Sequence, residues 1–568
     1  MEPQMDTKEH KYKRNKKIGT KRLIKVSSAS VCVYLWFAVL TSCSSQPTDM
    51  RTLVPADALV YLETNDLGAA LQPIIDSKPF SEVAKRKPDL SALKGVQLAV
   101  AITGFETSEE KVNDEQSVGK IQPHFVAIAD THAWQFQTVR FAEQKLGSFV
   151  ADIYDSEPTL EEHEKGGGHY LTWTAKDGRK AYALVKANLI YFGNDETSIE
   201  KCLAVARGEA DSIAKGGKVA ASDPGTLASG YVSQDGVAQI ANIFALKFAQ
   251  DASEEPETQS AIAGLLPKVI RNSVAEIKWS AATTDKGIED RYVISTPPAL
   301  TARFLDSFQT PEINEPNRIL TNTLLAQLPS DTKVATRYNL RSPASAWESV
   351  MLGANQSLDP IEVKMVAQFV GLLFTPYEIR DPSNFLKATQ SSRYANPAIV
   401  TAKIGSIDPD PILIFEGGTI QDVTKTLLPG LIPPKPVIEG GVNVYNYPPS
   451  EGGDAGVPQV VFDGGGYTAI GPENLLKNLR GNRFGDLSDI RTEPLRVLAQ
   501  SDAPISSFGV DDSSANSIAD MLSEKKNTDA KAPSTYFTET RFTKSGIERK
   551  TTSDFGFIGW IIAQLAEE

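Results

Sequence analysis

Short motifs recur in the same order along this chain, and their recurrence constrains the fold more than any other feature of the sequence. Val54–Val60 shares Pro, Asp and Val with Leu328–Val334, and Leu189–Gly193 is echoed by Gly466–Gly471. The offset between partners is roughly 275 residues, much longer than the repeat of a solenoid protein. The sequence therefore predicts two diverged, domain-sized copies in tandem.

Each copy mixes strand patterns with helix patterns. Phe125–Asp130 is typical of a strand, and Trp134–Leu146 is typical of a helix. Leu171–Ala175 and Arg179–Val185 flank an Asp-Gly pair, which indicates a tight hairpin. Hairpins that alternate with helices predict an α+β fold, with an antiparallel sheet and helices packed on one face of it. A parallel sheet of the Rossmann type is the alternative.

The body of the chain is acidic. The first 42 residues carry nine Lys/Arg against three Asp/Glu, and the remainder carries 49 against 68. Binding to nucleic acid depends on clustered basic side chains that displace counterions from phosphates. The charge therefore argues against a nucleic-acid partner.

The number and positions of the cysteines restrict the cross-links that the body can form. Only Cys32, Cys43 and Cys202 occur, and the first two precede the body. No disulfide framework can form within the body. Cys202 lies among apolar residues at helical spacing, which predicts a buried thiol in the core rather than a nucleophile.

The N-terminal segment has the three parts of an export signal. A basic stretch, Lys8–Lys25, precedes the uncharged stretch Val26–Ser42. Leu40-Thr41-Ser42-Cys43 resembles the lipobox of bacterial lipoproteins, and the resemblance implies a palmitoylated Cys43 that becomes the first residue after cleavage. The alternative is an uncleaved single-span anchor, because the uncharged stretch approaches the ~20 residues that cross a bilayer.

Both alternatives place the body outside the cytoplasm, in the cell envelope. By resemblance to known lipoproteins, the absence of Asp directly after Cys43 implies the outer membrane in a Gram-negative cell, with the body in the periplasm. The predicted division is a signal peptide (1–42), a tether (43–51), the first copy (52–300), a Pro-containing connection (301–319) and the second copy (320–568).

Three features together resemble uncharacterised bacterial envelope lipoproteins that are classed as a domain of unknown function. They are Pro55–Ala58 after the leader, the strand-to-helix turns at Gly193 and Gly471, and the closing Ser553–Gly556. The resemblance implies an extracytoplasmic, non-catalytic protein, and it brings no known active residues.

One short span gathers imidazole and carboxylate side chains. His163 and His169 lie among glutamates, and such nitrogen and oxygen donors bind zinc and other divalent ions. The spacing is not that of an HExxH motif, and Gly166–Gly168 predict a flexible loop. Metal binding is therefore a secondary hypothesis with His163 and His169 as its candidate ligands, and no cofactor is expected.

The body contains no recognisable catalytic set. No serine lies in a Gly-x-Ser-x-Gly motif, although a carboxylate pair of the glycosidase type stays open as an alternative. The sequence predicts a lipid-anchored envelope protein that binds an unidentified protein or ligand or acts as a scaffold. The alternative is an envelope hydrolase or metal-dependent enzyme that uses the His163 to His169 loop or that carboxylate pair.

The proline-rich span Leu428–Pro458 is the predicted wall of a ligand site that lies between the two copies or on their loops. Prolines reduce the conformational entropy that a loop loses on binding. Tyr445 and Tyr447 offer aromatic contact area. An ordinary exposed loop is the alternative.

Overall fold

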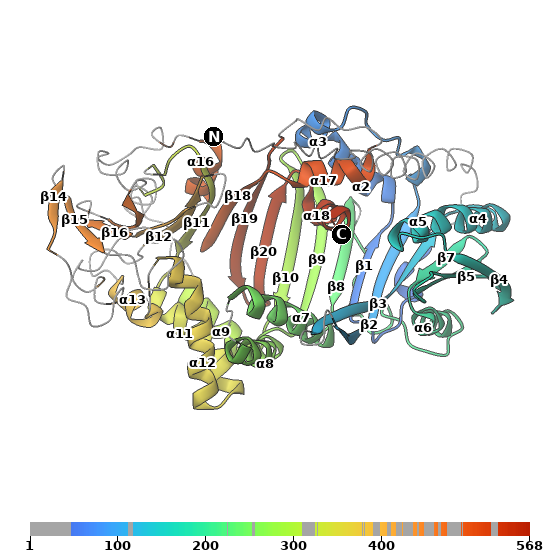
Figure 1. The fold of residues 1–568 in the computed structure, drawn as a ribbon, viewed down its shortest axis with the longest axis horizontal. Helices are drawn as coiled ribbons and strands as arrows, with labels where there is room; N and C mark the ends of the chain where they lie inside the picture. Colours follow the sequence, from blue (N-terminus) through green and yellow to red (C-terminus); the bar gives the residue numbers. More distant parts are fainter. Residues whose placement is uncertain are drawn as a thin grey trace, which may run out of the picture.

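The structure is a computed structural model with an α+β fold, as predicted, in which helices surround one large antiparallel sheet (Figure 1). It describes residues 47–111, 117–223, 225–252, 256–308, 324–326, 328–377, 379, 381–389, 398–405, 410–415, 423, 426, 435–439, 442–447, 459–463, 467–473, 490, 492–523 and 532–567. Cys43, the leader and most of the span Leu428–Pro458 lie outside these residues. Among the helices that are described, none has both the length and the apolar character of a membrane span.

The first half of the chain forms ten strands of the sheet. Hydrogen bonding gives the lateral order β4-β5-β6-β7-β3-β2-β1-β8-β9-β10, antiparallel throughout. The strands are β1 (Val60–Thr64), β2 (Gln97–Lys111), β3 (Ser117–Asp130), β4 (Thr159–Lys165), β5 (Gly168–Thr174), β6 (Lys180–Lys186), β7 (Leu189–Gly193), β8 (Thr226–Val232), β9 (Glu276–Thr284) and β10 (Gly287–Ser295).

The second half forms ten more strands in the order β14-β15-β16-β17-β13-β12-β11-β18-β19-β20. This order is the order of the first half with every strand number raised by ten. The strands are β11 (Thr332–Asn339), β12 (Ala398–Ile404), β13 (Asp410–Phe415), β14 (Val437–Glu439), β15 (Val442–Tyr447), β16 (Gln459–Asp463), β17 (Thr468–Pro472), β18 (Ile505–Asp511), β19 (Ser534–Thr543) and β20 (Gly546–Ser553).

The two sets of strands are joined edge to edge by β10 and β20, which run antiparallel near the middle of the sheet (Figure 1). Arg291 pairs with Lys550 at the centre of this joint. Two ion pairs flank the centre in mirrored positions, Arg291 to Glu548 at 3.1 Å and Lys550 to Glu289 at 2.7 Å. The joint therefore has the self-complementary character of a two-fold interface.

Helices cover both faces of the sheet, so the prediction of helices on one face is wrong. Neighbouring residues of β1 show why, because Tyr61 belongs to one core cluster and Leu62 packs against another. Successive side chains of a strand point to opposite faces, and apolar residues on both faces require cover on both. Helix α6 (Glu196–Ala206) contributes to the cluster on the Tyr61 side, and helix α2 (Leu67–Asp76) contributes to that on the Leu62 side.

The other helical elements of the described residues have the following bounds. They are η2 (Met50–Thr52), α3 (Lys78–Val83), η3 (Ser91–Leu93), α4 (Gln135–Phe141), η4 (Ala142–Leu146), α5 (Gly147–Ile153), α7 (Gln234–Ala252), α8 (Pro256–Ser273), α9 (Pro298–Phe308), α11 (Pro343–Ser357), α12 (Pro360–Gly371), η5 (Leu372–Tyr377), α13 (Pro382–Ala388), α16 (Glu493–Gln500), α17 (Ser514–Leu522) and α18 (Gly556–Glu567).

The last helix of each half packs against the other half. From α9, Leu300 and Phe304 join a core cluster with Leu340 of the second half. From α18, Ala563 joins a cluster with Ile74 of the first half. The predicted connection 301–319 thus begins within a packed helix, and the C-terminal apolar run lies against the first half as well as its own.

Candidate functional site

The histidine-containing span forms a regular hairpin, and the prediction of a flexible loop is wrong. Strands β4 and β5 are joined by Gly166 and Gly167, whose φ angles are 63° and 76°. A tight two-residue turn that matches the twist of its strands needs positive φ at both positions, and glycine adopts it without steric cost. The glycines therefore close a hairpin between two ordered strands.

The register of this hairpin separates the two predicted metal ligands. His163 pairs with Tyr170, one position away from the pair formed by Glu164 and His169. Because side chains alternate between faces along a strand, His163 and His169 point to opposite faces of the hairpin. His163 is exposed and its ring centroid lies 4.9 Å from that of Tyr170. The two histidines therefore cannot bind one ion.

His169 instead meets a glutamate from a distant helix. Its Nε2 atom lies 3.6 Å from Oε1 of Glu143 in η4 and 3.5 Å from Oε2 of Glu162 in β4. The other ring nitrogen, Nδ1, lies 3.5 Å from Oε1 of Glu164. The Nε2 atom is shielded from solvent and has no hydrogen-bond partner among the described residues. An imidazole nitrogen thus faces two carboxylates at distances too long for good hydrogen bonds.

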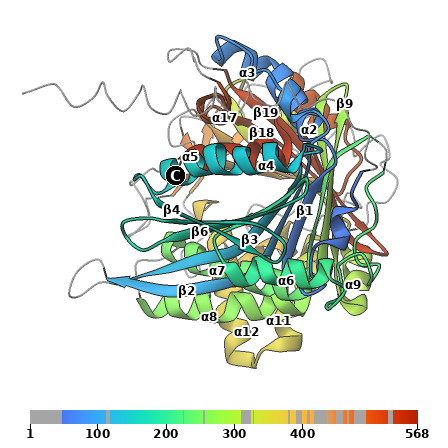
Figure 2. The same ribbon diagram turned by 90° about the vertical axis from the view of Figure 1, so that its right-hand side faces the viewer.

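A π-helical turn places Glu143 in this position. The segment η4 is a π-helix between α4 and α5, and the three form one rod across the sheet (Figure 2). Ala142 and Val150 of this rod are buried in a core cluster with Leu171 and Trp173 of β5, which fixes the rod on the face where His169 lies. π-helical turns are rare in proteins, but those that occur are often found at functional sites, because the extra residue redirects a side chain.

An open hollow of about 640 Å³ lies beside this cluster. An imidazole, carboxylates, a guanidinium and a phenyl ring line it, and it is widely open to solvent. Its lining residues are Gln135, Phe136, Val139, Arg140, Glu143, Gln144, Glu164 and His169. These residues all belong to the first half, and every histidine of the chain lies before residue 170. The second half therefore has no counterpart of the His169 cluster.

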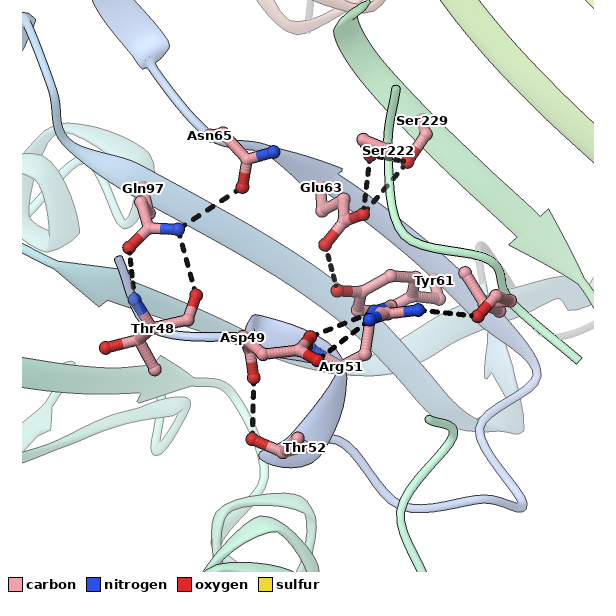
Figure 3. A network of polar contacts seen from close by, with 11 residues as sticks. Thr48, Asp49, Arg51, Thr52, Tyr61, Glu63, Asn65, Gln97, Ser222 and Ser229 are labelled. Atoms are coloured by element: carbon pink, nitrogen blue, oxygen red, sulfur yellow. Dashed lines mark hydrogen bonds and ion pairs between the residues drawn. The ribbon is translucent and has the colours of Figure 1, made fainter. Parts of the chain in front are cut away.

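A second polar network lies on β1 (Figure 3). Tyr61 donates to Oε2 of the buried Glu63 at 2.7 Å, and Ser222 and Ser229 donate to Oε1 at 2.8 and 3.1 Å. Burial, with the charge of Glu63 beside it, raises the pKa of Tyr61 far above its usual value. Both carboxylate oxygens accept hydrogen bonds inside a packed core, so this network holds the structure together and leaves no ligand position.

The start of the described chain is docked beside this network rather than free as a tether. Thr48 donates its backbone N–H to Oε1 of Gln97 at 2.8 Å and accepts from Nε2 of Gln97 at 2.9 Å. Its hydroxyl also donates to Asp130 at 2.6 Å. Arg51 forms an ion pair with Asp49 at 2.8 Å and donates to the carbonyl of Val219 at 2.9 Å. The predicted tether 43–51 is thus bound to the sheet from Thr48 onward.

The other predicted site residues are placed as follows. Tyr445 lies on β15, partly buried against a core cluster that contains Phe385 and Phe415. The backbone of Tyr447 pairs with Gln459, and its side chain lies outside the described residues. Cys202 is buried on α6, as predicted, and burial raises its pKa to about 12. A thiol in that state is not a nucleophile near neutral pH.

Sequence reasoning identified His169 and the neighbouring glutamates, Glu162 and Glu164 among them, but not Glu143. Glu143 lies 26 positions before His169, in a span whose sequence predicts only a helix, and no local pattern links the two. The signal that could have grouped Glu162, rather than His163, with His169 was the turn itself, because a hairpin closed at Gly166 and Gly167 places Glu162 on the face of His169.

Comparison with known proteins adds no relative from which a role could be transferred. No family model matches the chain, and no curated protein or solved structure is significantly similar to it.

Proposed function

We propose that this chain is a lipid-anchored, extracytoplasmic binding or scaffold protein of the bacterial envelope, tethered through Cys43. The observation that carries the proposal is the lipobox-like Leu40-Thr41-Ser42-Cys43 after a basic and an apolar stretch. The resemblance to envelope lipoproteins of unknown function points the same way. The proposed membrane is the outer one if the cell is Gram-negative.

The docked start of the body is consistent with such an anchor. Three residues separate Cys43 from Pro47, and an extended chain spans at most ~3.6 Å per residue, so an anchor at Cys43 would hold the body within roughly 14 Å of Pro47. Thr48 is fixed to Gln97 and Asp130. The membrane would therefore lie close to one defined end of the sheet.

Exposed aromatic side chains lie at that same end. Trp134 is 67% exposed and Phe136 is 70% exposed, and both follow Asp130 within a few residues. Aromatic side chains are favoured at the interface between lipid and water. The anchor would bring these two rings to the membrane surface.

The test of the anchor compares two cysteines of the leader. Cys43→Ser should abolish incorporation of labelled palmitate and leave an unprocessed precursor, because the acyl acceptor is gone. Cys32→Ser is the matched control and should be labelled and processed as the parent protein is. Normal palmitate labelling of Cys43→Ser would contradict the proposal, and a mature protein that retains residues 1–42 would favour the single-span anchor.

We also propose that the two halves are copies of one ancestral domain. Their strands follow the same lateral order, and the pairing of Val60 with Val232 recurs as that of Val334 with Gly509. These two pairs are related by offsets close to that of the sequence motifs. The two-fold character of the β10–β20 joint supports the same history.

An envelope enzyme is the second candidate function, and the hollow beside His169 is the observation that favours it. A carboxylate and an imidazole in one hollow could assist hydrolysis as base or metal ligands. Activity profiling of the purified protein against ester, peptide and glycoside probes separates the candidates. Turnover that is lost in His169→Ala would favour the enzyme.

A further inference from the structure

We propose that Glu143, Glu162 and His169 bind a divalent transition-metal ion of the zinc class at the wall of the hollow. The three residues come from η4, β4 and β5, and their ligand atoms all lie within 4.8 Å of one another. The proposal concerns the folded body alone, so it stands or falls independently of acylation at Cys43.

The spacing of the donor atoms fits a tetrahedral ion. Ligands ~2.0–2.1 Å from zinc are about 3.4 Å from one another at the corners of a tetrahedron. The Nε2 atom of His169 lies 3.6 Å from the Glu143 oxygen and 3.5 Å from the Glu162 oxygen. These two distances are within a few tenths of an ångström of a tetrahedral edge, and the two carboxylate oxygens lie within 4.8 Å of each other, so side-chain movement of the two glutamates would complete the site.

The state of the His169 ring points to a missing partner. Its Nε2 atom is shielded from solvent and makes no hydrogen bond among the described residues, although two carboxylates face it. Buried polar atoms of proteins are nearly always satisfied. A metal ion would use the lone pair of Nε2 and both carboxylates at once.

Glu164 supplies the orientation that histidine ligands commonly have. Its Oε1 atom lies 3.5 Å from Nδ1 of His169, on the ring edge opposite to the ligand nitrogen. At 3.5 Å this contact is longer than a good hydrogen bond, and a small shift of the exposed Glu164 side chain would let its carboxylate accept a hydrogen bond from Nδ1–H and leave Nε2 free to bind metal. Glu164 is therefore a positioning residue in this arrangement.

The donor set selects among ions. An imidazole with two carboxylates suits zinc and its neighbours in the transition series, whereas calcium and magnesium prefer more ligands and oxygen alone. Three protein ligands leave a fourth tetrahedral position for water or for a donor group of a ligand. The adjacent hollow is open to solvent, which gives such a group access.

The test is a calorimetric titration of the full-length protein in detergent with zinc chloride, after removal of metals with a chelator. One zinc ion per chain should bind, and His169→Ala should weaken this binding by about 100-fold or more. His163→Ala is the matched control, because His163 lies on the opposite face of the same hairpin, and it should bind zinc as the parent protein does.

Two conservative variants test the site even if His169→Ala does not fold. Glu143→Gln and Glu162→Gln keep the size of each side chain, and each should weaken zinc binding at least ~10-fold with an unchanged circular dichroism spectrum. Cobalt bound in place of zinc should give the visible absorption of a tetrahedral site, and Glu143→Gln should change it. A role of these residues in folding alone would not alter that spectrum.

Several outcomes would overturn the proposal. These are the absence of stoichiometric zinc binding, binding that survives in His169→Ala, and loss of binding in His163→Ala. Calcium binding as tight as zinc binding would also overturn it, because that result indicates a surface cluster of carboxylates. If zinc fails to bind and magnetic resonance shows a protonated His169, the carboxylates pair with an imidazolium instead.

Discussion

Asp290 shows how one buried side chain links the two halves. It lies on β10, accepts from Nε1 of Trp279 at 2.9 Å and accepts from the backbone N–H of Phe557 in α18 at 2.8 Å. Burial raises the pKa of this carboxyl to about 6, against the lowering effect of both hydrogen bonds. A first-half carboxylate thus holds the first turn of the last helix of the second half.

This raised pKa predicts a pH dependence of stability. Because the folded protein holds the proton more tightly than the unfolded chain, Asp290 stabilises the fold fully below about pH 4, and that contribution is lost as the pH rises to about 6. A shift of about two pKa units corresponds to roughly 3 kcal/mol. Denaturant unfolding gives the free energy of unfolding of Asp290→Asn and of the parent protein. The value for the variant minus that for the parent protein should be about 3 kcal/mol larger at pH 7 than at pH 4.

The exposed Asp285, in the same hairpin, provides the control. Asp285→Asn should unfold with a pH profile parallel to that of the parent protein. A parallel profile for Asp290→Asn as well would show that the buried carboxyl does not hold its proton in the folded state.

At the scale of single elements, the turn of the β4–β5 hairpin makes a second prediction. Gly167 has a φ of 76°, so Gly167→Ala should lower the free energy of unfolding by about 1 kcal/mol, because a side chain strains this backbone conformation. Gly264 lies within α8 with open space around it, and Gly264→Ala should raise stability by up to ~1 kcal/mol. Thermal unfolding measures both, and a stabilising Gly167→Ala would disprove the turn.

The elements also show what sequence patterns can predict. The hairpin of β5 and β6 was predictable because its turn, with Gly178 at a φ of 89°, is a local signal. Strand β4 was missed because its residues are mostly exposed and charged, which removes the alternation that identifies a strand. The packing of helices on both faces of the sheet involves segments that are far apart in the sequence, and no local sequence pattern predicts it.

The candidate site was likewise predictable from the sequence only in part. His169 was identified from the local composition, but its assignment to one metal site with His163 was wrong, because the register of the hairpin places the two side chains on opposite faces. Glu143 reaches the site through a π-helical turn and tertiary packing against β5. Hydrogen bonding in a single turn and contacts between distant elements leave no periodic trace in a sequence.

At the scale of the whole molecule, the exchange of α9 and α18 makes the halves interdependent. The clusters at the joint combine Ile74 with Ile518 and Phe304 with Leu340. Residues 47–309 and 320–568, expressed separately, should therefore show no cooperative thermal unfolding, because each would expose half of these clusters. Co-expressed halves should purify as a complex, and a cooperatively folded single half would contradict this account.

In the whole molecule the two halves share one strand order, but one feature is present in only one of them. The hollow and the His169 cluster belong to the first half, at the end of the sheet where residue 47 enters. In the proposed envelope protein, this end lies toward the membrane and the metal site lies beside it.

The most direct test of this account is crystallography of the protein grown with zinc, with anomalous differences collected above and below the zinc absorption edge. The account predicts a strong peak ~2.0–2.1 Å from Nε2 of His169, within bonding distance of Glu143 and Glu162. It also predicts no peak at His163. Crystals that contain zinc without a peak at His169 would contradict the central claim that this cluster is a binding site.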